Sequence, residues 1–106
     1  MTTTNDNCTH PACSLTGAEF RERRETVIAA LRQDVLEVRE TQQGYTYRFS
    51  GTDDMLLRLA EFIRTERMCC AFFTFTLTVG NAQSDIWLEL SGPDGTKEFI
   101  RAELGM

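Results

Sequence analysis

Lysine is almost missing from this chain, and basic residues form no cluster along it. Lys97 is the single lysine, the ten arginines are scattered, and the formal net charge is −5. A protein that binds nucleic acid needs a basic patch to neutralise the phosphates. Nucleic acid is therefore not expected as a partner.

Long apolar runs are missing as well. No stretch approaches the length of a membrane span, and the first residues lack the basic-then-apolar pattern of a signal peptide. The sequence therefore predicts a cytoplasmic protein with no membrane partner. Two prolines and seven glycines leave no room for a long linker. We expect a flexible N-terminal tail over residues 1–12 and one domain over residues 13–106.

Apolar residues change their spacing along the chain in a regular order. Helical spacing, with capping residues at Thr16 and Thr52, predicts two long helices, and alternation predicts two hairpins. The predicted elements are a helix over 17–33, a hairpin over 36–49, a helix over 53–68, a hairpin over 73–90 and a short helix over 96–104. This α-ββ-α-ββ-α order indicates an α+β fold, with one four-stranded antiparallel sheet from two hairpins and helices mainly on one face.

Alternation in the second hairpin also assigns its two faces. The residues expected on the helix-covered face are Phe73, Phe75, Leu77, Ile86, Leu88 and Leu90. A slip of one residue would expose all of them, so the threonines between them are expected to face away from the helices.

Cysteine is the residue type that carries chemistry here. In a reducing compartment the four cysteines are expected to remain thiols. The neighbours Cys69 and Cys70 stand where the second long helix meets the following strand, and they cannot form a disulfide without strain. Their thiolates are soft ligands for ions such as Zn(II), Cu(I), Hg(II) or As(III). The alternative is that both are small buried apolar residues.

A second cluster lies near the N-terminus. Cys8, His10 and Cys13 follow a Cys-x-His-x-x-Cys pattern, in which a short loop can direct three side chains at one ion. Cys13 is the strongest candidate of the three, because it precedes the start of a helix, where the helix dipole favours thiolate.

Glu66 is an acid on an otherwise apolar helical stripe that includes Leu59, Ile63 and Cys70. It could be a fourth ligand or a proton donor near the thiols. The favoured interpretation is that Glu66 pairs with a neighbouring arginine at the rim. Arg24, close to the apolar stripe of the first helix, is itself expected to pair with an acid.

Three stretches of the chain resemble a largely uncharacterised family of short bacterial proteins. They begin at Cys13, Glu66 and Trp87, and the middle stretch carries the motif Glu-Arg-x-Cys-Cys-x-Phe-x-x-Phe. The family usually has proline after the cysteine pair, where this chain has Ala71. The resemblance implies a heavy-metal context, mercury especially, and implies that Cys13 belongs with the cysteine pair.

These observations predict a protein that binds a soft or heavy metal ion through Cys13, Cys69 and Cys70, for sequestration, delivery or sensing. Trigonal sulfur coordination suits Hg(II), As(III) or Pb(II), while His10 or Cys8 would complete a tetrahedral zinc site. Binding is expected rather than catalysis. One alternative is a thiol-dependent enzyme in which Glu66 protonates the carbon of an organometallic substrate. Another is an interaction domain with structural cysteines, and a homodimer is left open.

Overall fold

The computed structural model describes residues 18–105. Its elements are α2 (Ala18–Asp34), β1 (Glu37–Thr41), β2 (Gly44–Phe49), α3 (Asp53–Cys69), β3 (Thr74–Thr78), β4 (Ile86–Ser91), α4 (Thr96–Phe99) and a π-helix (Ile100–Leu104). This order confirms the predicted α+β class. The predicted tail over 1–12 lies outside the described residues, as does the cap expected at Thr16. None of the described helices is long and apolar enough to cross a membrane.

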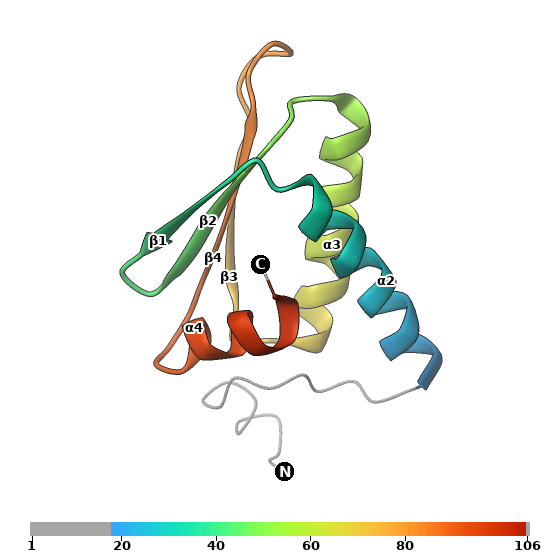
Figure 1. Cartoon of the computed structure of the whole chain (residues 1–106), viewed down its shortest axis with the longest axis vertical. Helices are drawn as coiled ribbons and strands as arrows, with labels where there is room; N and C mark the ends of the chain where they lie inside the picture. Colours follow the sequence, from blue (N-terminus) through green and yellow to red (C-terminus); the bar gives the residue numbers. More distant parts are fainter. Residues whose placement is uncertain (1–17, 106) are drawn as a thin grey trace.

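The four strands form one antiparallel sheet in the order β1-β2-β4-β3. The two predicted hairpins are β1–β2 and β3–β4, and they join where β2 pairs with β4. The partners Tyr47 and Leu88 define that register. Figure 1 shows α2 and α3 beside each other on one side of the sheet, with α4 and the π-helix near one end.

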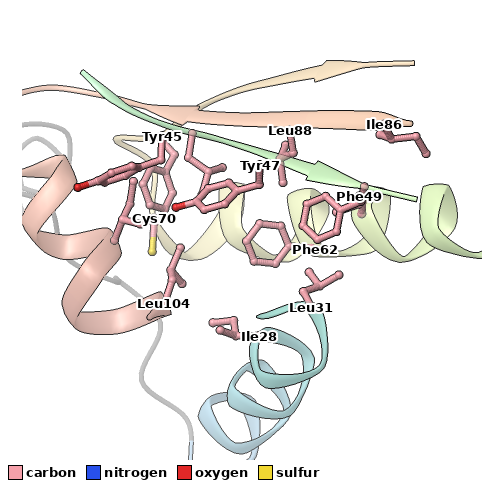
Figure 2. Close-up of a cluster of buried hydrophobic side chains, with 14 of the residues drawn as sticks. Ile28, Leu31, Tyr45, Tyr47, Phe49, Phe62, Cys70, Ile86, Leu88 and Leu104 are labelled. Carbon is pink, nitrogen blue, oxygen red and sulfur yellow. The ribbon is translucent and has the colours of Figure 1, made fainter. Parts of the chain in front are cut away.

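The core lies between this sheet face and the helices. Alternate residues of the two central strands point inward, so Tyr47, Phe49 and Leu88 are fully buried (Figure 2). Leu90 is fully buried as well. Helix α3 begins at the predicted position. Thr52 caps it, since its side chain accepts a hydrogen bond from the backbone N–H of Met55 at 3.1 Å.

Strand β3 presents the predicted face to the helices but is less buried than β4. Its threonines are exposed, as expected, and Phe73 just before it is buried, but Phe75 and Leu77 are only half-buried. The reason is topological: β3 is an edge strand, so its inward side chains have neighbours on one side only. Alternation identified the correct face but could not identify the edge.

The closing helix also differs from a single regular helix over 96–104. It begins as α4 and ends as the π-helix, where the N–H of Gly105 donates to the carbonyl of Ile100 at 3.0 Å. Gly105 has a φ of 66°, a left-handed conformation that suits glycine at a helix end. Ile100 and Leu104 lie on one face of this segment, and both are fully buried.

Candidate functional site

The cysteine pair lies at the C-terminal end of α3, as predicted. Cys69 is the last helical residue, and Cys70 closes the helix by donating its backbone N–H to the carbonyl of Glu66 at 2.6 Å. The Cys70 side chain is fully buried and belongs to the core cluster of Figure 2. Helix α3 therefore carries this thiol into the interior rather than presenting it on the surface.

Glu66 lies one helical turn before Cys70 and is also buried, with 1 % of its side chain exposed. The Arg24 guanidinium reaches it from α2 with two hydrogen bonds, Nε to Oε2 at 2.7 Å and Nη2 to Oε1 at 3.1 Å. Arg24 itself is 7 % exposed. The prediction that Glu66 pairs with an arginine is confirmed, but its placement at the rim was wrong.

Interior placement of this pair follows from the helical positions of its members. Glu66 continues the buried series Leu59 and Phe62 along α3, while Arg24 precedes buried Ile28 by one turn of α2. Each charge therefore points into the layer between the helices, where the other neutralises it through two hydrogen bonds. Burial opposes the charge on Arg24, but the hydrogen bonding and charge of Glu66 outweigh it and raise the pKa of Arg24.

The Cys70 thiol completes a buried chain of three groups. Its Sγ donates to Glu66 Oε1 at 3.8 Å, and that carboxylate is held by Arg24. Burial, followed by the negative charge of Glu66, raises the pKa of Cys70 to about 12, and Arg24 offsets only part of this. Cys70 is therefore a protonated thiol at neutral pH, with the Glu66 carboxylate as its hydrogen-bond acceptor.

The raised pKa of Cys70 predicts that the metal-free protein loses stability as pH rises above 9. The thiol has a pKa of about 12 in the fold and 9.0 ordinarily, so between these values the folded state keeps a proton that the unfolded state releases. The free energy of unfolding should therefore be undiminished below pH 9 and then fall by up to about 1.4 kcal/mol per pH unit. Urea unfolding between pH 9 and pH 10 measures this slope.

Cys70→Ala is the matched control for that slope. Tyr47 is buried and also has a raised pKa. The loss of stability that it causes begins only above its ordinary pKa of 10.0, and this loss is common to both proteins. Below pH 10 the parent should lose stability and Cys70→Ala should not. Equal slopes in the two proteins would show that Cys70 does not carry the linkage.

A pocket of about 180 Å³ between α2 and α3 borders the Arg24–Glu66 pair. Its lining residues are Arg23, Arg24, Val27, Glu61, Phe62, Arg64, Thr65, Glu66 and Met68. Both members of the buried ion pair thus reach a surface opening.

The remaining predicted ligands are placed less fully. Cys8, His10 and Cys13 lie outside the described residues, and Cys69 is placed by its backbone. Among the side chains that the structure describes, no group of three histidine, cysteine or acidic residues could hold a metal ion. Comparison of the chain with protein-family models, with curated proteins and with solved structures finds no match.

Proposed function

We propose that this protein binds a soft or heavy metal ion through thiolates, with Cys70 as the inner ligand and Cys69 and Cys13 as its co-ligands. The observation that carries the proposal is the Cys70 thiol 3.8 Å from the Glu66 carboxylate. A metal ion can bind the sulfur only when the thiol proton leaves, and Glu66 is placed to accept that proton.

The burial of Cys70 favours a very soft ion over zinc. At pH 7 a thiol with a pKa of about 12 is ionised in only about one molecule in 10⁵, against about one in 10² at the ordinary 9.0. A metal must therefore overcome about a thousandfold more proton competition than at an ordinary thiol. Softer ions form stronger bonds with thiolate sulfur, so Hg(II) fits this donor better than Zn(II).

The co-ligands follow from position in the chain. Cys69 is the neighbour of Cys70 at the end of α3, and Cys13 precedes the start of α2 by a few residues. Three thiolates would give the trigonal coordination that Hg(II) accepts, and His10 or Cys8 would add the fourth ligand of a zinc site. The role would be sequestration, delivery or sensing of the ion in the bacterial cytoplasm.

A second candidate function is cleavage of a carbon–mercury bond, and the contact between Cys70 and Glu66 favours it. The Cys70 sulfur would bond to mercury and displace the anion or water that the organomercurial carries, while Glu66 takes the thiol proton. Glu66 would then deliver that proton to carbon as the carbon–mercury bond breaks, and Cys69 would take the vacated position on mercury and lose its own proton to solvent. Release of a hydrocarbon from an organomercurial, measured by gas chromatography, would separate this enzyme from a binder.

The test of binding is a titration of the reduced protein with Hg(II), and separately with Zn(II), in weakly buffered solution. We expect one Hg(II) per chain, thiolate-to-mercury charge-transfer absorbance, and release of protons to a pH indicator. Zn(II) should bind more weakly and lose affinity more steeply as the pH falls. Proton release should be smaller by about one proton in Cys70→Ser, the matched variant.

Two outcomes would contradict the proposal. One is the absence of charge-transfer absorbance at one equivalent of Hg(II). The other is Hg(II) binding whose affinity and proton release are unchanged in Cys70→Ser, because the buried thiol would then take no part.

A further inference from the structure

The two edges of the sheet differ in their chemistry. Edge strand β1 carries Glu37, Arg39 and Glu40, and these make ion pairs such as Arg48–Glu37 at 3.0 Å and Lys97–Glu40 at 2.6 Å. Edge strand β3 reads Thr-Phe-Thr-Leu-Thr and has no charged residue and no proline. Charges and prolines are the devices that keep an edge from pairing with another strand, so β1 is protected and β3 is not.

An apolar strip runs along the β3 edge. Phe75 and Leu77 are half-buried, and Val79 just beyond the strand is 46 % exposed. Helix α3 adds half-buried Leu56 and Ile63, and Leu56 lines one surface depression together with Val79. The β3 edge thus combines unpaired backbone with partly exposed apolar side chains, and the depression shared by Val79 and Leu56 joins its end to α3.

We propose that this surface binds a second copy of the chain, with β3 pairing antiparallel to β3 of the copy about a twofold axis near Thr76. The two four-stranded sheets would then form one continuous sheet, and the two strips would cover each other. Within residues 18–105 no strand pairs with the outer edge of β3, so its backbone groups are available for such a ladder. An antiparallel pair of identical strands satisfies the requirement that a twofold interface be self-complementary.

The charges of α3 favour a copy of this chain over an unrelated partner. Asp53 and Asp54 lie in the first turn of α3, and Arg67 lies in the last. The twofold axis reverses the direction of the helix, so the acidic end of one α3 approaches the basic end of the other. The helix dipoles are then antiparallel as well. The acidic first turn of each α3 would lie near the positive charge of the last turn of the other.

The test is the oligomeric state of the whole chain by sedimentation equilibrium over a range of concentrations. We expect the wild-type protein to reach twice its 12.1 kDa mass in the micromolar range. Thr76→Lys should raise the dissociation constant of the dimer about a hundredfold, because two like charges meet near the axis of an edge-to-edge pair. The Thr76 side chain is exposed, so the substitution should leave the fold of the monomer intact.

Val38→Lys is the matched control, since it adds the same charge at an exposed position of the opposite edge. It should leave the dimer unchanged, and circular dichroism should show that both variants are folded. A wild-type protein that remains a monomer up to millimolar concentration would overturn the proposal. So would a dimer that Val38→Lys dissociates and Thr76→Lys does not. This inference is independent of metal binding and is tested without metal.

Discussion

Replacing Arg24 with methionine is expected to lower the free energy of unfolding by about 3–5 kcal/mol. The substitution keeps an apolar side chain of similar length but leaves the Glu66 carboxylate in the interior without its guanidinium partner. Taking away one member of a buried pair costs far more than the pair itself contributes, because the remaining charge has lost both water and its counter-charge. Denaturant unfolding at pH 7 measures the effect.

Arg64→Met is the control for this prediction, because Arg64 pairs with Glu61 at 2.6 Å on the exposed face of α3. Arg64→Met should lower the free energy of unfolding by less than about 1 kcal/mol. The double variant Arg24→Met with Glu66→Leu should regain much of the stability that Arg24→Met loses, since no unpaired charge remains. Equal costs for Arg24→Met and Arg64→Met would mean that the interior pair is solvated in solution.

Replacing Cys69 and Cys70 together with serine is expected to weaken Hg(II) binding by at least about a thousandfold. The double substitution takes away two of three proposed sulfur ligands and puts in hydroxyl groups, which are hard donors that stay protonated at neutral pH. Serine is close to cysteine in size, and a hydroxyl at position 70 can still donate to Glu66, so the fold should survive. A thousandfold loss corresponds to about 4 kcal/mol of binding free energy. Competition with a thiol chelator measures it.

Cys8→Ser is the matched control, and it should change the affinity little. Cys13→Ser should give an intermediate loss, since it takes away one sulfur. If the double variant binds Hg(II) as tightly as the parent, the ion is held elsewhere, and the N-terminal cluster of Cys8, His10 and Cys13 becomes the candidate.

Local patterns were sufficient to predict the elements and the face that each buries. Alternation in β4 placed Ile86, Leu88 and Leu90 inward, and Thr52 marked the start of α3. The pairing of β2 with β4 was not predictable in the same way, because it depends on how two hairpins meet rather than on either one. For the same reason the partial exposure of Phe75 became apparent only with the strand order.

The sequence predicted that Glu66 and Arg24 would each pair with an opposite charge, but not that they would pair with each other. Helical spacing put Glu66 on the stripe that leads to Cys70, and Arg24 stood beside an apolar stripe of its own. The contact between them joins positions 42 residues apart and depends on how α2 crosses α3. Nothing local to either helix specifies that crossing, which is why the pair was expected at the rim.

The burial of Cys70 has a consequence for its resistance to oxidation. Peroxides and alkylating reagents attack the thiolate, and access to the sulfur governs the rate. A fully buried thiol that keeps its proton meets neither condition, so it should remain reduced while exposed thiols are converted to sulfenic acid. Burial thus protects the Cys70 thiol chemically, and under the proposed function it would keep this ligand reduced until an ion binds.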